Sequence, residues 1–199
     1  MAIKITIASV LFLLAGACYL LRELKIAKKK AIVDLMKDFV DSSPAVIILP
    51  FCNFQSALFL MSCLIANEFI YDNIFAGAGL FAIGYVSASV ISVWGDFVAA
   101  KAIVSIGASA AAIIPLLAFW KGEAKMKAAA GVYGALTIPV LSYAFSITWN
   151  PGFLALAVGD ALLIVAETMP ENKAARVISD MFYFFGTCFV PLSLTGGWL

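Results

Sequence analysis

Long apolar runs, several of them close to 20 residues, are the feature that most constrains this chain. Hydrophobic residues make up 64% of the sequence and charged residues 13%, and the mean hydropathy is +1.04. A soluble domain of 199 residues could not bury so much apolar surface, whereas helices of about 20 apolar residues span the hydrocarbon core of a bilayer. We therefore expect an all-α, multi-pass integral membrane protein with a single domain over residues 1–199.

Seven apolar stretches predict a bundle of about seven transmembrane helices, with eight as the alternative count. A further stretch, residues 31–41, places its apolar side chains on one face and predicts an amphipathic helix in the membrane interface. The tryptophans fall at span ends, which is the level of the bilayer that this side chain prefers. The expected spans cover residues 3–21, 44–66, 74–94, 102–120, 128–147, 152–166 and 178–194.

Histidine is absent from the sequence, which excludes several classes of site. Neither a histidine-ligated haem or zinc nor a Ser-His or Cys-His catalytic pair can form. The four cysteines have no Cys-x-x-Cys spacing and lie in apolar runs, so we expect them to pack in the interior. We expect no metal and no cofactor, and no basic block is long enough to predict a nucleic-acid partner. The partner expected from composition is the lipid bilayer.

Two Gly-Asp pairs, Gly95-Asp96 and Gly159-Asp160, are the most informative polar features of the apolar runs. A charged side chain at the bilayer centre costs about 2.5–3.5 kcal/mol on insertion scales, so such a residue usually faces a polar cavity and has a function. We expect Asp96 and Asp160 to share one cavity, where one carboxyl group would be the base and the other the proton donor. Such a pair can activate water without metal or histidine. The alternative is that both are buried hydrogen-bonding or helix-end residues.

A further set of residues resembles a known family in order and approximate spacing, mainly within residues 128–195. The pattern is similar to the C-terminal half of the YhhN (lysoplasmalogenase-like) family of membrane proteins, whose members usually have eight helices. The segment from Leu80 to Asp96 resembles the first Gly-Asp helix of that family. The residues that carry the main resemblance are Val132-Tyr133, Tyr143-Ala144, Gly159-Asp160-Ala161-Leu162-Leu163, Pro170, Ala175-Arg176-Val177, Tyr183 and Leu192-Ser193.

By this resemblance, the chain would be a hydrolase that cleaves the vinyl-ether bond of a lysophospholipid. Asp96 and Asp160 would match the two catalytic aspartates of the family, and Tyr183 its tyrosine on the last helix. Hydrogen-bond donors expected near the level of Asp160, and a threonine that stands where the family usually has a glutamine, are candidates for substrate binding. These candidate substrate-binding residues are Tyr143, Asn150 and Thr187.

Two other functions remain open from the residues alone. A small-solute or ion transporter or channel would use both aspartates to carry protons or cations through helices interrupted by prolines. A non-enzymatic subunit of a homo-oligomer or larger membrane complex would use the small residues of spans 74–94 and 102–120 for helix–helix contacts.

Overall fold

The described part of the chain consists of helices. A computed structural model describes residues 53–169 and 173–194, together with seven residues between Thr6 and Leu21. The first expected span is described only at those seven positions, and the expected amphipathic helix at 31–41 lies outside the described residues. Six helices are therefore seen where about seven transmembrane helices were predicted. They are α3 (Phe54–Asp72), α4 (Ile74–Ser92), α5 (Ala99–Ala118), α6 (Ala124–Thr148), α7 (Pro151–Thr168) and α8 (Lys173–Leu194).

Helices α4 to α8 begin and end within a few residues of the predicted spans, but the span predicted at 44–66 is displaced. Asn53, expected inside that span, is instead the N-cap of α3, and its side chain accepts a hydrogen bond from the Ser56 amide (2.9 Å). An asparagine at this position satisfies an amide that has no partner within the helix. The same side chain donates a 2.5 Å hydrogen bond to the carbonyl of Leu194, which ties the start of α3 to the end of α8.

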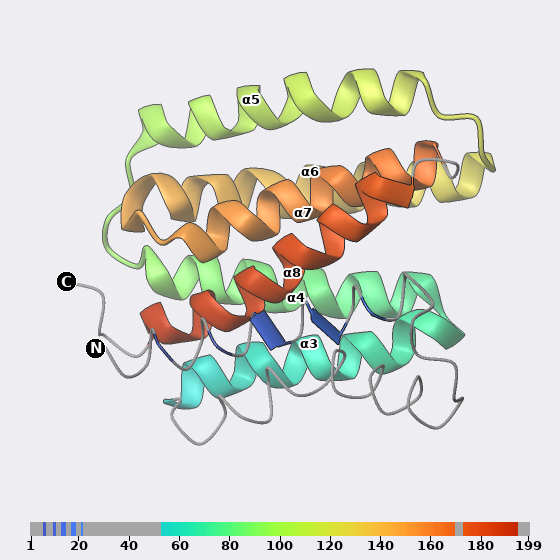
Figure 1. Cartoon of the computed structure of the whole chain (residues 1–199). Helices are drawn as coiled ribbons and strands as arrows, with labels where there is room; N and C mark the ends of the chain where they lie inside the picture. Colours follow the sequence, from blue (N-terminus) through green and yellow to red (C-terminus); the bar gives the residue numbers. More distant parts are fainter. Residues whose placement is uncertain are drawn as a thin grey trace.

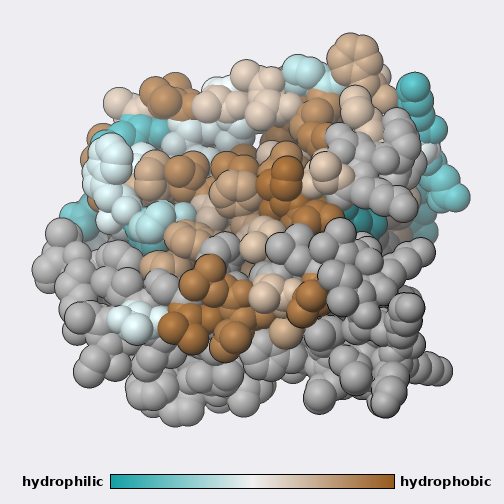
Figure 2. All heavy atoms as spheres, in the orientation of Figure 1, coloured by the Kyte–Doolittle hydropathy of each residue, from teal (hydrophilic) through white to brown (hydrophobic). Residues whose placement is uncertain are grey.

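Four of the described helices are long and apolar enough to cross a membrane: α4, α5, α6 and α7. Helix α3 contains a shorter apolar segment, Phe54–Ala66. Figure 2 shows hydrophobic side chains across the middle of the visible face and hydrophilic ones towards its two ends. Since a helix satisfies its backbone hydrogen bonds internally, such a bundle suits a bilayer, and these features are those of a multi-pass membrane protein.

Consecutive helices run antiparallel, and α6 and α7 occupy the middle of the bundle (Figure 1). Helix α5 lies along one edge beside α6, and the hairpin of α3 and α4 forms the opposite edge. Helix α8 crosses the bundle obliquely, because its start packs on α7 and its end reaches the start of α3. The core consequently lies between α3, α4, α6, α7 and α8, with Leu60, Tyr85, Leu141, Leu156 and Val190 fully buried.

Candidate functional site

Asp160 is a buried carboxyl group near the middle of α7. It is 6% exposed, and the Tyr133 phenol donates a 3.1 Å hydrogen bond to its Oδ1 atom. Its Oδ2 atom is also buried and has no hydrogen-bond partner among the described residues. A buried polar atom left unpaired costs about 1–3 kcal/mol. An ionisable group in the interior of an apolar helix bundle usually has a function.

The side chains around Asp160 come from four other helices. Tyr85, Tyr133 and Cys63 all lie within electrostatic range of the Asp160 carboxyl group, and Tyr183 lies within range of Tyr85 and Tyr133. The rings of Tyr85 and Tyr183 are joined through Phe81, whose centroid is 5.8 and 5.6 Å from theirs. We call Cys63 (α3), Tyr85 (α4), Tyr133 (α6), Asp160 (α7) and Tyr183 (α8) the Asp160 cluster.

Thr137 supports the cluster from the next turn of α6. It is fully buried, and its hydroxyl lies beside the Asp160 carboxyl group. That hydroxyl donates a 3.1 Å hydrogen bond to the carbonyl of Tyr133, four residues earlier in the same helix. Tyr133 and Thr137 therefore present a phenol and a hydroxyl from one face of α6 towards the carboxyl group on α7.

Gly159 explains how α8 comes close to α7 beside Asp160. A Cβ atom at this glycine would lie 3.3 Å from the carbonyl oxygen of Ser179 and 3.4 Å from the Cβ atom of Phe182. The Ser179 hydroxyl donates a 2.8 Å hydrogen bond to the carbonyl of Gly159. The glycine thus lets the two backbones approach, and this approach brings Tyr183, one turn after Ser179, into the cluster.

The other Gly-Asp pair has a different structure. Helix α4 ends at Ser92, and Gly95 adopts φ +94°, a conformation that glycine reaches at little cost. Asp96 follows in the exposed loop before α5. Its backbone carbonyl accepts a 3.3 Å hydrogen bond from the Tyr143 hydroxyl, which also accepts one from the Val98 amide (2.8 Å).

The expectation that Asp96 and Asp160 share a cavity is therefore wrong. Asp160 is bound to Tyr133 and the Asp96 backbone to Tyr143, and both tyrosines lie on α6. Ten residues of helix correspond to about 15 Å along the axis. Asp160 is buried at one of these levels and Asp96 is exposed at the other, so the described geometry holds one buried carboxyl group rather than a pair.

The three candidate substrate-binding residues make hydrogen bonds with backbone groups. Asn150 caps α7 by accepting from the Gly152 amide (2.8 Å) and donates to the carbonyl of Phe189 (3.4 Å). The Thr187 hydroxyl donates to the Tyr183 carbonyl in its own helix (3.0 Å), and Tyr143 holds the loop after α4. Among the predicted partners of Asp160, the structure brings only Tyr183 into its cluster, and substrate binding by the other three stays a prediction.

Sequence reasoning overlooked Cys63 and Tyr85, and it quoted Tyr133 only for the family resemblance. The number of residues from each helix end was a usable signal, because the cluster residues lie at one depth of an antiparallel bundle. Each is eight to eleven residues from the helix end on the same side of the molecule, or roughly 12–17 Å. The counts run from Asp72 to Cys63, Ile74 to Tyr85, Ala124 to Tyr133, Thr168 to Asp160 and Lys173 to Tyr183.

Comparison with known proteins identifies no relative of this chain. No family model, no curated protein and no solved structure gives a significant match to the chain. Within residues 53–169 and 173–194, no three metal-ligating side chains gather in one place. The chemistry of the site therefore has to be argued from the Asp160 cluster itself, and the resemblance to the YhhN family stays a prediction.

Proposed function

We propose that the protein is a membrane-embedded hydrolase that cleaves the vinyl-ether bond of a lysophospholipid, with Asp160 as the proton-transfer residue. The observation that carries the proposal is the buried Asp160 carboxyl group, with one oxygen bound to Tyr133 and the other without a partner in the described part of the chain. The substrate class comes from the resemblance of residues 128–195 to the YhhN family. The apolar surroundings of the cluster suit a lipid substrate.

Vinyl-ether hydrolysis needs one acid rather than a pair. In its first step, a protonated Asp160 would transfer its proton to the carbon of the double bond that is not attached to oxygen. The electron pair of that double bond forms the new C–H bond and leaves an oxygen-stabilised cation. General acid catalysis of this kind contributes about 10²–10⁴-fold. That the described residues place no second buried carboxylate next to Asp160 is therefore compatible with this chemistry.

Water completes the reaction and restores the acid. The oxygen of a water molecule forms a bond to the cation, and the Asp160 carboxylate takes one of its protons. The hemiacetal that results then breaks its bond to the glycerol oxygen, with proton transfer to that oxygen, to give a fatty aldehyde and a free hydroxyl. Tyr133 would stabilise the carboxylate after the first step, because a hydrogen bond to a charged acceptor is stronger than one to a neutral acceptor.

Deuterium labelling tests this proposal. Purified protein is incubated in D₂O with a vinyl-ether lysophospholipid, and the released aldehyde is analysed by mass spectrometry. We expect a single deuterium on the carbon next to the aldehyde group and a slower rate than in water, because the transferred proton comes from an exchangeable acid. The saturated alkyl-ether analogue, which cannot accept a proton on carbon, should not be cleaved. Absence of aldehyde with wild-type protein would overturn the proposal.

A further inference from the structure

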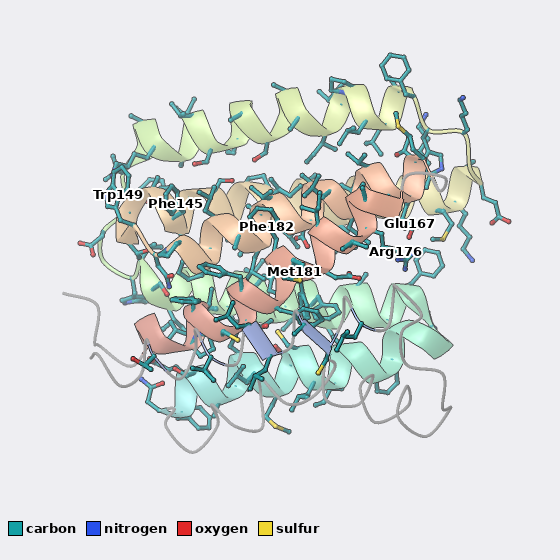
Figure 3. The ribbon with its side chains drawn as sticks, viewed as in Figure 1. Phe145, Trp149, Glu167, Arg176, Met181 and Phe182 are labelled. Carbon is teal, nitrogen blue, oxygen red and sulfur yellow. The ribbon has the colours of Figure 1, made fainter. Side chains whose placement is uncertain are left out.

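A charged pair lies at the end of the bundle where α7 ends and α8 begins. Arg176 Nη1 is 3.3 Å from Glu167 Oε1, and this contact joins the end of α7 to the start of α8. The Arg176 side chain is 63% exposed and that of Glu167 34%, so the pair lies at the surface of the bundle. Figure 3 shows both residues at one end of these helices, with Trp149 at the other.

The pair is in helical phase with the cluster. Glu167 follows Asp160 by seven residues on α7, and Arg176 precedes Tyr183 by seven on α8. Seven residues make nearly two turns, so each charged residue projects from the same side of its helix as the cluster residue, about 10 Å nearer the end. Arg176 and Glu167 therefore lie at the outer end of the helix faces that carry Asp160 and Tyr183.

From this placement we propose that Arg176 binds the phosphate group of the lipid substrate while its vinyl ether reaches Asp160. The inference rests on the proposed function and adds the orientation of the substrate. In a lysophospholipid, seven covalent bonds separate the phosphorus from the carbon that accepts the proton, a span of roughly 9 Å when extended. This span matches the offset of about 10 Å between Arg176 and the cluster along the helix axes.

Cationic side chains lie at this end of the bundle together with the carboxylates of Glu123 and Glu167. The loop before α6 and the first turn of that helix carry Lys121, Lys125 and Lys127, and at the other end of α5 Asp96 lies in the loop and Lys101 in the first turn of α5. Arg176 differs from these lysines in being in phase with the cluster, and Lys125 is held 4.8 Å from the ring centroid of Phe75. Arginine also binds phosphate oxygens in a bidentate way, which a lysine cannot do.

The existing salt bridge does not oppose phosphate binding. Exposed ion pairs typically contribute only about 0–1 kcal/mol, so Arg176 exchanges Glu167 for a phosphate group at little cost. This property supplies a matched control. Glu167→Gln removes the same salt bridge as Arg176→Gln, but only the second substitution removes the guanidinium group.

Binding of a lipid that cannot be cleaved tests the subsite without any need for activity. Isothermal titration of the full-length protein would use a saturated alkyl-ether lysophospholipid, the matching phosphate-free alkylglycerol and inorganic phosphate. We expect Arg176→Gln to lower the preference for the phospholipid over the alkylglycerol by about 10- to 100-fold, as loss of charge-assisted hydrogen bonds implies. Glu167→Gln should keep that preference. Equal losses in the two variants, or no loss in Arg176→Gln, would overturn the subsite.

The same experiment distinguishes a lipid headgroup from free phosphate as the ligand of Arg176. Inorganic phosphate should bind the wild-type protein at least about 100-fold more weakly than the lysophospholipid, because it lacks the apolar chain that reaches the cluster. Inorganic phosphate binding as tightly as the lipid would overturn the assignment to a lipid headgroup.

Failure of the subsite and failure of the proposed function give different results. In kinetic assays with a vinyl-ether lysophospholipid, Arg176→Gln should raise KM by about 10- to 100-fold, the cost of losing a charge-assisted contact. If the wild-type protein releases aldehyde and Arg176→Gln has an unchanged KM, the proposed function is supported and the subsite is refuted. If lipid binding depends on Arg176 but the wild-type protein releases no aldehyde, the subsite is supported and the hydrolase function is refuted.

Discussion

Tyr133 donates a 3.1 Å hydrogen bond to Oδ1 of Asp160, and this contact joins α6 to α7 inside the bundle. It is the hydrogen bond seen on the Asp160 carboxyl group in the described residues, since Oδ2 has no partner there. The carboxyl group is thereby held by one oxygen, while the other is buried without a hydrogen-bond partner in the described residues. This arrangement underlies the proposed acid role of Asp160.

Tyr133→Phe removes the phenol oxygen and keeps the ring. The Asp160 carboxyl group then loses its hydrogen bond, and we expect a free energy of unfolding lower by about 1–3 kcal/mol. Aldehyde release should fall by about 10- to 100-fold in kcat, because the carboxylate formed in the first step is less well stabilised. Thermal unfolding in detergent and the aldehyde assay measure the two effects. An unchanged kcat would show that Tyr133 does not act on the reacting carboxyl group.

Gly159→Ala tests the close approach of α7 and α8. The added Cβ atom would lie 3.3 Å from the Ser179 carbonyl oxygen, and overpacking of this kind costs about 1–3 kcal/mol. Gly107→Ala is the matched control, because Gly107 lies in α5 with nothing within 4 Å of an added Cβ atom. It should raise stability by about 0.5–1 kcal/mol through helix propensity alone. Equal changes in the two unfolding temperatures would contradict this packing.

Asn150→Ala separates helix capping from substrate binding. Loss of the cap to the Gly152 amide and of the contact to the Phe189 carbonyl should lower stability by about 1–2 kcal/mol. Asn150→Ser should recover part of this loss, because serine also caps helices. KM should stay near the wild-type value in both variants, since ten residues, or about 15 Å of helix, separate Asn150 from Asp160. A large rise in KM without a loss of stability would restore the substrate-binding prediction.

The positions of α4 to α8 could be predicted from the sequence because the length and apolar character of a membrane helix are local properties. The start of α3 could not be placed, because Asn53 follows an apolar run and looks like a polar residue within a span. Its capping role depends on where the helix begins, and on Leu194 at the far end of the chain.

The site was harder to predict than the helices. Gly95-Asp96 and Gly159-Asp160 are the same dipeptide, yet one is a turn and the other is helical. Both are followed by apolar residues, Phe97 to Ala100 after Asp96 and Ala161 to Ala166 after Asp160, so the neighbouring sequence does not separate them. The contact between Tyr133 and Asp160 depends on how two helices are rotated against each other, and no local pattern reports this rotation.

Comparison of Asp160→Asn with Asp96→Asn in aldehyde release from a vinyl-ether lysophospholipid separates a single buried acid from a catalytic pair. Both substitutions replace a carboxyl group by an amide of the same shape, one inside the Asp160 cluster and the other in an exposed loop. We predict that Asp160→Asn lowers kcat by at least about 10²-fold, as loss of a general acid implies, while Asp96→Asn keeps most of the activity. Comparable losses in both variants, or an active Asp160→Asn protein, would contradict the role proposed for Asp160.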